Sequence, residues 1–529
     1  MATQTPVRAG KLMSLASTRP ERIPLRLPVN RSLPGSDGIA VLVLGVVAAV
    51  LGAWNLTGAS PYMDDEGTYT AQAFSVLRGD LAPYTYQYDH PPLGWIQLGA
   101  LAWIPQALGL GDGTYVGATR FAMIPFFVAT VVLTYLIARR MRVQAPLAVL
   151  AAALVLLSPL SLTLGRQIYL DNIALPWLLL AFYLALNERK ALWHHIGAGV
   201  FFAVAVLSKE TLAIFGPSLL VALLNRPTWS NRVFSVVGFL IVGGAALALY
   251  PLMALLRGEF FSGGGHVSLQ DALVYQFLTR SGSGSIWEAG SSRAELLQGW
   301  LFYDRPLVVV GLVAAVLCLV QRRSMWIPVG IAFFSVPIVT GEGYLPAMYI
   351  IGVLPFLALA VCCALNMAWG WLERVADQQT PSVRRAVRAA GAVTLAFVLL
   401  VTVAPQWVGQ NRTLLTHQTN QDWSSALAWA EENIPRDDTV LAPYSMWQDL
   451  SASGWSGAWS VVATEKADLD PEFLNQHPEG ADAIDWVVVG PFVESNIDQL
   501  GLTMAGEALE NSVPVQTFGG WSIHRVLND

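Results

Sequence analysis

Long apolar runs dominate the chain and recur at intervals typical of a polytopic membrane protein. A membrane-spanning helix needs about 20 mainly apolar residues, and somewhat fewer where neighbouring helices shelter it. By that criterion the pattern predicts eleven transmembrane helices, near residues 38–57, 116–138, 145–164, 173–187, 196–208, 211–225, 233–255, 306–320, 325–340, 346–370 and 387–405. The predicted fold class is therefore a polytopic α-helical membrane protein.

One further apolar run, from Leu93 to Leu110, is preceded by Pro92 and interrupted by Pro105. Short loops that are rich in Lys and Arg stay on the cytoplasmic side of a membrane. Counting this run as a span would move the basic cluster at 139–142 to the outside. We therefore predict an interfacial or re-entrant helix here.

The same rule gives the predicted topology. The basic segment 1–37 is polar and too long before the first apolar run for a cleavable signal peptide, so we expect it in the cytoplasm. Residues 38–405 then form the transmembrane domain, with two outer loops at 58–115 and 256–305. Residues 406–529 are predicted to be extracytoplasmic.

Composition and charge support this division. The chain is 54% hydrophobic and 13% charged, against about 25% charged in an ordinary soluble domain, which excludes a soluble globular protein and a disordered chain. Residues 406–529 hold 18 acidic and 4 basic side chains, whereas the rest carries a net charge of +8. The three cysteines all lie in apolar runs, so no disulfide framework is expected.

The acidic tail is predicted to be a small α/β domain. Asp422 is expected to cap a helix over 423–434, residues 439–442 and 484–489 are strand-like, and 446–450 is helical. A hairpin over 513–526 would turn at Gly519 and Gly520.

Three consecutive carboxylates, Asp64, Asp65 and Glu66, follow the first predicted helix. Adjacent carboxylates at a membrane boundary repel one another unless a cation, a metal ion or a proton offsets their charge. We interpret the cluster as part of a functional site. The alternative is a solvated loop start that is acidic without function.

The same outer loop contains an aromatic segment, 84–93, in which two prolines follow His90. His90 either donates a hydrogen bond to a phosphate or carboxylate, or lies incidentally in an interfacial aromatic belt. Arg120 lies near the outer end of the second predicted helix. We expect it to have a bidentate partner, either a carboxylate of the 64–66 cluster or a phosphate of a ligand.

Other predicted outer segments bring charged or aromatic residues to the same boundary. Arg166 and Asp171 lie in the loop between the third and fourth helices, where a plain ion pair is the alternative to a site. Lys209 interrupts an apolar stretch, which snorkelling to the interface would also explain. Tyr344 lies beside Glu342 before the tenth helix.

Walker loops, dinucleotide-binding glycine patterns, zinc-type spacings and Gly-x-Ser-x-Gly elbows are absent from the sequence. The charged groups suit a substrate that is anionic and partly buried in lipid. Arg and Lys would hold its phosphate while a carboxylate performs acid–base chemistry at the water boundary. A lipid-linked phosphate fits this description.

In these residues the sequence resembles the GT-C superfamily of membrane glycosyltransferases, in particular the bacterial branch with protein O-mannosyltransferases and lipid A aminoarabinose transferases. The resemblance covers about residues 38–405 in order and topology. It rests on Asp65-Glu66, the Tyr- and Ala-rich helix after them, His90-Pro91-Pro92-Leu93, Arg120, the Asp171 loop and Leu207-Ser208-Lys209.

The resemblance implies transfer of a sugar from a polyprenyl-phosphate or pyrophosphate donor to an acceptor hydroxyl on the outer leaflet, with inversion. It implies that Asp65 is the general base, while Arg120, Lys209 and Arg166 offset charge on the departing phosphate. Glu66 and His90 would orient groups around the base, and Asp171 would be a second acid. The extra Asp64 departs from a plain Asp-Glu pair and leaves open which Asp acts.

The resemblance leaves the metal open. Asp64, Asp65, Glu66 and Asp171 offer oxygen ligands for Mg²⁺ or Mn²⁺, yet Arg120 and Lys209 would neutralise charge equally well. The expected partners are the lipid-linked donor, a glycan, lipid or protein acceptor and the bilayer. No nucleic-acid partner is expected.

Three other functions stay open. A lipid transporter or flippase would use the same charges as a transit pathway, but it predicts charges through the bilayer midplane and an inverted repeat. A membrane scaffold that presents the acidic domain would leave the 64–66 cluster unexplained. A glycan polymerase or ligase would use a pyrophosphate-linked oligosaccharide.

Overall fold

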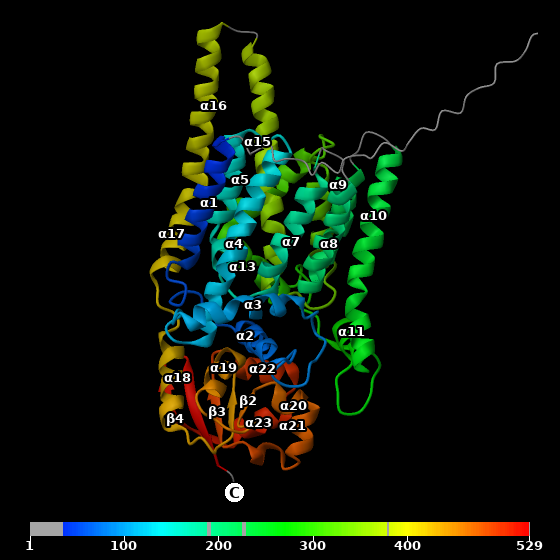
Figure 1. Ribbon diagram of the computed structural model, residues 1–529. Helices are drawn as coiled ribbons and strands as arrows, with labels where there is room; N and C mark the ends of the chain where they lie inside the picture. Colours follow the sequence, from blue (N-terminus) through cyan, green and yellow to red (C-terminus); the bar gives the residue numbers. More distant parts are fainter. Residues whose placement is uncertain (1–34, 188–191, 225–228, 378–379, 528–529) are drawn as a thin grey trace, which may run out of the picture.

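A helical bundle and a smaller C-terminal domain form the two parts of the molecule (Figure 1). The computed structural model describes residues 35–187, 192–224, 229–377 and 380–527. Residues 1–34 of the predicted cytoplasmic segment lie outside the described residues. Between the bundle and the C-terminal domain, α2 (Asp64–Arg78) and α3 (Leu93–Ala107) form a layer of short helices (Figure 1).

Each of the eleven predicted spans corresponds to helix. The bundle comprises α1 (Gly35–Ala53), α4 (Tyr115–Arg140), α5 (Ala145–Leu157), α6 (Pro159–Leu164), α7 (Leu170–Ala185), α8 (Leu192–Ser208), α9 (Gly216–Leu224), α10 (Trp229–Leu247), α11 (Leu249–Arg257), α13 (Ser292–Cys318), α14 (Trp326–Thr340), α15 (Leu354–Asp377), α16 (Pro381–Thr402) and α17 (Ala404–Thr416). The 3₁₀ helices Glu210–Phe215 and Ala347–Val353 precede α9 and α15, and the loop helix α12 (Leu269–Val274) lies after α11.

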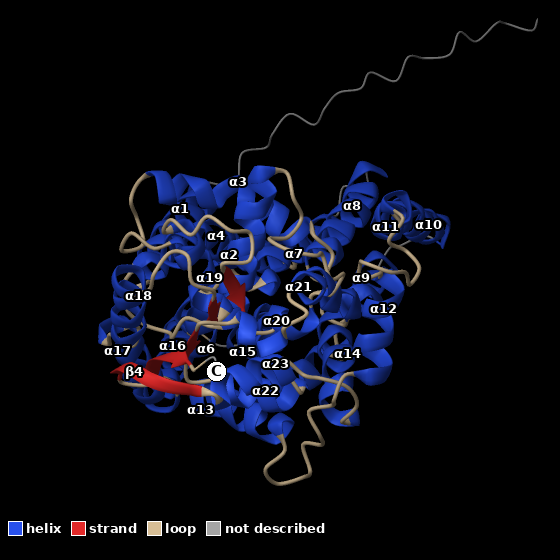
Figure 2. Cartoon of the chain, turned by 90° about the horizontal axis from the view of Figure 1, so that it is seen from below, coloured by secondary structure: helices blue, strands red, loops and turns tan. Residues whose placement is uncertain are grey.

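Five helical segments are long and apolar enough to cross a membrane, namely Tyr115–Arg140, Arg232–Arg257, Ser292–Cys318, Ala347–Ala376 and Pro381–Thr402. Six shorter apolar helices accompany them among the described residues. The count of eleven spans therefore stays a prediction. Helix α10 lies at the edge of the bundle (Figure 2). Its large apolar side chains, such as Phe234, Leu240 and Ile241, are exposed, as contact with lipid requires.

Several predicted spans differ from the observed helices in their bounds. The span near 145–164 is two helices, because Pro159 begins α6 and Ser158 caps it. The helix predicted to start near 306 begins earlier, at Ser292, and contains a kink at Asp304. Asp304 accepts hydrogen bonds from the hydroxyl of Ser158, from Trp407 Nε1 at 2.9 Å and from the amide of Leu307 at 3.0 Å.

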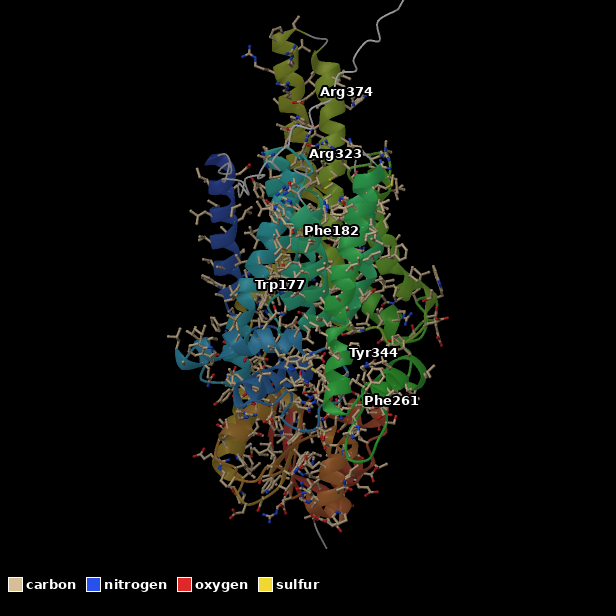
Figure 3. The ribbon with its side chains drawn as sticks, turned by 45° about the vertical axis from the view of Figure 1, so that its right-hand side comes forward. Trp177, Phe182, Phe261, Arg323, Tyr344 and Arg374 are labelled. Carbon is tan, nitrogen blue, oxygen red and sulfur yellow. The ribbon has the colours of Figure 1, made fainter. Side chains whose placement is uncertain are left out.

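Two arginines of the predicted cytoplasmic loops lie at one end of the bundle. Arg323 and Arg374 lie toward the end opposite the C-terminal domain, whereas Tyr344 and Phe261 lie near that domain (Figure 3). This separation agrees with the predicted topology, in which basic loops lie on one side and the candidate site on the other.

The C-terminal domain is a five-stranded sheet with short helices. Its strand order is β2 (Val461–Ala463), β1 (Val440–Ala442), β3 (Trp486–Val489), β5 (Trp521–Val526) and β4 (Ser512–Phe518). Strand β1 pairs parallel with β2 and β3, while β5 pairs antiparallel with β3 and β4. The helices are α18 (Gln421–Asn433), α19 (Tyr444–Ala452), α20 (Lys466–Leu469), α21 (Pro471–Gln476), α22 (Val493–Leu500) and α23 (Thr503–Glu510).

The predicted hairpin and the two predicted strands of this domain are confirmed. The predicted cap is wrong, because α18 begins at Gln421 and Asn420 occupies the N-cap position. Asp422 lies in the first turn instead. The side chain of Asn420 binds outside the helix, where its amide donates to the carbonyl oxygens of Thr57 at 2.7 Å and Ser60 at 3.0 Å.

The C-terminal domain and the loop layer share one apolar core. Buried side chains of α2 and α3, including Tyr69 and Trp95, belong to the same cluster as Trp447 and Trp521 of the domain. Gly67 makes the contact close, because a Cβ atom there would lie 1.9 Å from the carbonyl oxygen of Tyr444. The start of α2 is therefore fixed against the start of α19.

Candidate active site

The three carboxylates at the start of α2 point in three different directions. Glu66 is fully buried and forms a bidentate ion pair with Arg120, with Nε–Oε1 at 2.8 Å and Nη2–Oε2 at 2.6 Å. The remaining Arg120 donors bind carbonyl oxygens of the segment before α2, those of Leu56 and Ser60 at 3.0 Å and of Pro61 at 3.1 Å. Of the two partners expected for Arg120, the structure therefore contains the carboxylate.

Asp64 faces the C-terminal domain. Its carboxylate accepts from the amide of Ser445 at 3.2 Å and from Asn496 Nδ2 at 3.4 Å. Burial raises the pKa of this carboxyl above its usual range. Asp64 therefore belongs to the contact between the two parts of the molecule.

Asp65 is exposed to solvent, and no residue that the structure describes donates a hydrogen bond to its carboxylate. Desolvation by the surrounding protein raises its pKa, while the positive charges of Lys209 and Arg280 act in the opposite direction. Among the three carboxylates, Asp65 is the one free to receive a proton from another molecule.

His90, Lys209 and Glu210 form a chain of contacts beside Asp65. His90 Nδ1 lies 3.1 Å from Glu210 Oε2, and Lys209 Nζ lies 2.9 Å from His90 Nε2. Since an ammonium group only donates, Nε2 accepts this bond and Nδ1–H donates to Glu210. Burial alone would lower the pKa of Lys209, but Glu210, Asp171 and Asp65 outweigh it and raise that pKa.

Local contacts fix His90 in this position. The hydroxyl of Tyr86 donates to the His90 carbonyl oxygen at 2.5 Å and lies 3.3 Å from the hydroxyl of Tyr250. Gly94 allows α3 to approach the end of α8, because a Cβ atom there would lie 2.7 Å from the carbonyl oxygen of Ser208. These contacts bring the two motifs around residues 90 and 209 together.

Asp171 lies in the first turn of α7 and is buried. Its carboxylate and those of Asp65 and Glu210 all raise the pKa of Lys209. The alternative of a plain ion pair with Arg166 is wrong, because no described contact joins the two side chains and Arg166 Nη1 instead donates to the carbonyl oxygen of Trp54 at 2.5 Å. Asp171 therefore lies on the Lys209 side of the layer.

Arg166 is 3% exposed, and its Nε and Nη2 atoms lack a hydrogen-bond partner among the described residues. Burial and the neighbouring Arg120 lower its pKa to about 10. Buried donors without a partner are unfavourable, and the predicted partner of Arg166 is a phosphate of a ligand.

Two charged residues near Asp65 escaped the sequence analysis. Arg280, in the outer loop after α12, stacks over the ring of Tyr344 at 3.7 Å and acts electrostatically on Asp65. Glu465 comes from the C-terminal domain, and burial followed by Asp64 and Asp65 raises its pKa to about 7. Neither residue lies next to a long apolar run, which was the signal that singled out the others.

The carboxylates proposed as metal ligands are engaged separately, Glu66 with Arg120 and Asp64 with Ser445 and Asn496. Within the described residues, no three His, Cys, Asp or Glu side chains are grouped to hold a metal ion. The cationic side chains of Lys209 and Arg280 offset negative charge near Asp65.

The arrangement of the chain is similar to that of known membrane glycosyltransferases. ArnT from Cupriavidus metallidurans bound to undecaprenyl phosphate superposes with a TM-score of 0.54 at 15% identity, covering 93% of this chain and 98% of that one. The archaeal oligosaccharyltransferase AglB from Archaeoglobus fulgidus, in complex with an inhibitory peptide and a dolichol phosphate, gives a TM-score of 0.54 at 13% identity, with coverages of 93% and 74%. The chain has the GT-C fold.

Sequence comparison supports the same assignment. Residues 89–254 match the family of dolichyl-phosphate-mannose-protein mannosyltransferases. This GT-C segment contains His90, Arg120, Arg166, Asp171 and Lys209. No curated protein matches the chain. The resemblance to the GT-C superfamily, predicted from the order of short motifs, is confirmed.

Proposed function

We propose that this protein is a membrane glycosyltransferase that moves a sugar from a polyprenyl-phosphate donor to an acceptor hydroxyl on the outer face of the membrane. The acceptor is a cell-envelope glycan, lipid or protein. One observation carries the proposal. The carboxylate of Asp65 is exposed, receives no hydrogen bond from a described residue, and lies beside the Glu210–His90–Lys209 chain at one end of an apolar helical bundle. The GT-C fold and the family match support it.

In the proposed reaction, Asp65 is the general base. It accepts the proton of the acceptor hydroxyl as that oxygen attacks the anomeric carbon of the sugar and the bond from this carbon to the donor phosphate oxygen breaks. Attack from the side opposite the leaving group inverts the configuration. The phosphate leaves as an anion, and Lys209 with the two free donors of Arg166 offsets its charge.

The other candidate residues support these groups in the proposal. Glu210 orients the imidazole of His90, whose Nε2 in turn holds the ammonium group of Lys209. Asp171 is the second acid, and its carboxylate stabilises the charged form of Lys209. Tyr344 fixes the guanidinium of Arg280. The pair Glu66–Arg120 positions the first turn of α2, from which Asp65 projects.

The apolar bundle accounts for the lipid part of the donor. The polyprenyl tail stays in the bilayer against the exposed apolar helices, while its phosphate reaches the loop layer. The basic residues Arg323 and Arg374 lie at the other end of the bundle (Figure 3). By the positive-inside rule, this supports the proposal that the site and the C-terminal domain face outward.

The test is transfer of radiolabelled sugar from polyprenyl-phosphate donors in membranes that contain wild type, Asp65→Asn or Asp64→Asn, each with and without EDTA. We expect Asp65→Asn to lower transfer at least about 100-fold, because it removes the base. Asp64→Asn distinguishes the two adjacent acids, since Asp64 binds the C-terminal domain. The EDTA arms decide metal dependence.

Full activity of Asp65→Asn would contradict the assignment and move the base to Asp64 or Asp171. Absence of product from folded wild type with every phosphate- and pyrophosphate-linked donor would favour the lipid transporter instead.

A further inference from the structure

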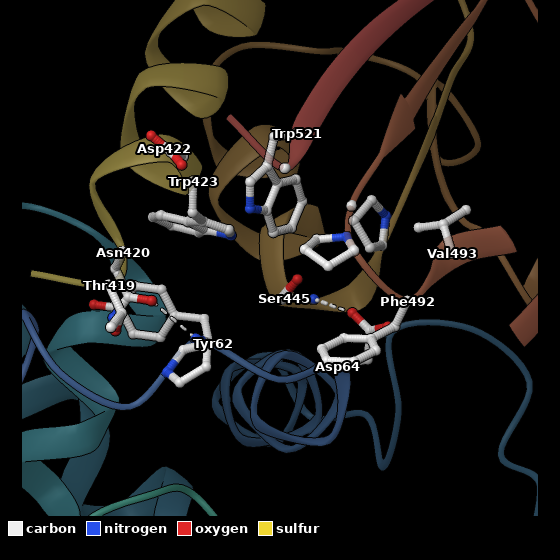
Figure 4. A pocket seen from close by; sticks show the side chains of 15 residues that line it. Tyr62, Asp64, Thr419, Asn420, Asp422, Trp423, Ser445, Phe492, Val493 and Trp521 are labelled. Atoms are coloured by element: carbon white, nitrogen blue, oxygen red, sulfur yellow. Dashed lines mark hydrogen bonds between the residues drawn. The ribbon is translucent and has the colours of Figure 1, made fainter. Parts of the chain in front are cut away.

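A cavity of about 150 Å³ lies where the C-terminal domain meets the segment before α2 (Figure 4). Its walls come from the starts of α2 and α18, the loops after β1 and β3, and the β4–β5 turn. The proposed transfer reaction uses none of its aromatic residues.

Aromatic rings form much of the wall. Tyr62 and Trp423 pack edge to face with their ring centroids 4.7 Å apart, and Trp521 and Phe492 complete the set. The exposed fractions are 2% for Trp423, 9% for Trp521 and 48% for Phe492. The cavity thus offers flat apolar surfaces between a buried interior and an open rim.

Polar groups lie between these rings. Nε1 of Trp423 is buried and lacks a hydrogen-bond partner among the described residues. Figure 4 shows this nitrogen on the side of the ring that faces Trp521 and Ser445. Since a buried unpaired donor is unfavourable, the indole is arranged to bind an acceptor atom of a ligand. The carboxylates of Asp422 and Asp64 also line the cavity.

A second, much smaller cavity of about 10 Å³ shares Asp64, Pro443 and Val493 with the first. It is lined by Glu465 and by Thr464, whose buried hydroxyl oxygen also lacks a partner among the described residues. Glu465 interacts electrostatically with both Asp64 and Asp65. Asp64 thus lies between the larger cavity and the carboxyl group of Glu465.

The lining indicates the chemistry of the ligand. Of the described residues that line the larger cavity, none is Lys, Arg or His, so an anion such as a phosphate has no counter-charge there. A lipid tail would leave the carboxylates and the indole N–H unpaired. A sugar ring presents apolar C–H faces to aromatic rings and hydroxyl groups that both donate and accept hydrogen bonds.

We propose that the larger cavity binds a sugar residue of a neutral glycan acceptor. This inference rests on the proposed function for the identity of the acceptor, but the saccharide site itself is testable without transfer. Trp423 Nε1 donates to the bound sugar, and Asp422 and Asp64 accept from its hydroxyl groups.

The experiment measures binding to the full chain in nanodiscs by ligand-observed NMR. The probes are neutral trisaccharides of hexoses and of pentoses, a peptide rich in Ser and Thr, and polyprenyl phosphate. Trp423→Phe removes the indole N–H, and Asp422→Asn removes one acceptor carboxylate at an exposed position. We expect each variant to weaken trisaccharide binding roughly tenfold, the value of one hydrogen bond to a buried site.

Trp455→Phe is the matched control. Trp455 is a buried tryptophan of the same domain, but its Nε1 donates to the carbonyl oxygen of Asp438 at 3.2 Å. This variant should lose stability and keep trisaccharide binding. Trp423→Phe should instead keep its stability and bind the trisaccharide more weakly. Polyprenyl-phosphate binding should stay unchanged in all three variants.

Trisaccharide binding that the variants leave unchanged would overturn the inference, as would no trisaccharide binding by wild type that still binds polyprenyl phosphate. Variant-sensitive binding of the peptide alone would overturn it in favour of a protein acceptor. Variant-sensitive trisaccharide binding without sugar transfer would instead refute the proposed reaction and leave the saccharide site standing.

Discussion

The buried pair Glu66–Arg120 shows how one residue sets the position of its neighbour. Glu66 receives two hydrogen bonds from Arg120 and a further one from the amide of Ile168 at 3.0 Å. Since its side chain is turned inward, the helix geometry of about 100° per residue turns Asp65 away from it toward Lys209. The pair therefore contributes to the site by orienting the side chain of Asp65.

Arg120→Lys tests this role. Lysine cannot make the bidentate contact and leaves several carbonyl oxygens unpaired, so we expect a loss of about 3–5 kcal/mol in unfolding free energy. Denaturant unfolding in detergent measures it, with the exposed Arg305→Lys as the control. An unchanged stability would show that the pair is dispensable for the fold.

Glu465 should control the pH dependence of transfer. With its pKa raised to about 7, its carboxyl ionises near neutrality and adds a negative charge that raises the pKa of Asp65. Because Asp65 must be ionised to act, Glu465→Gln should move the acidic limb of the pH–rate profile to lower pH. Profiles of wild type, Glu465→Gln and the exposed control Glu472→Gln measure this; coincident profiles would exclude the coupling.

The packing of helices and loops brings the site residues together, and this explains which of them the sequence alone could predict. Asp65, His90 and Lys209 stand out because each is charged at the edge of an apolar run, where a membrane protein tolerates charge for a reason. Arg280 and Glu465 lie in segments of ordinary polarity. Their approach to Asp65 depends on how the loop after α12 and the C-terminal domain dock, which no local pattern records.

Docking of the C-terminal domain depends on the contact between α2 and α19. A Cβ atom at Gly67 would lie 1.9 Å from the Tyr444 carbonyl oxygen, so Gly67→Ala should force the two helices apart and break the Ser445–Asp64 hydrogen bond. We expect faster hydrogen exchange of α19 amides and lower transfer. Gly238→Ala is the control, because no atom lies within 4 Å of a Cβ there. Unchanged hydrogen exchange of the α19 amides in Gly67→Ala would show that this contact does not fix the domain.

At the scale of the whole molecule, the C-terminal domain closes over the loop layer through buried polar groups as well as apolar ones. Lys466 Nζ donates to the carbonyl oxygen of Thr85 at 3.1 Å, and Asp449 Oδ1 accepts from the amide of Tyr115 at 2.6 Å. Such groups give the interface a defined register but make it sensitive to protonation. The domain is therefore part of the site it covers.

That sensitivity has a predictable sign. Burial raises the pKa of Asp449 to about 7, against an ordinary value of about 3.9, although the amides of Tyr115 and Val116 lower it and Glu431 raises it further. The docked state thus favours the protonated acid. Its stabilising contribution is complete below about pH 4, falls as the pH rises toward 7, and is constant above that.

Docking should therefore weaken by on the order of 2–4 kcal/mol over this range, with Glu465 acting in the same direction. Hydrogen exchange of α18 and α19 at several pH values measures it. Asp449→Asn should flatten most of the dependence and Glu465→Gln a further part, because neither amide ionises. A steep dependence in the double variant would assign it to other groups, such as Asp64, whose pKa burial also raises.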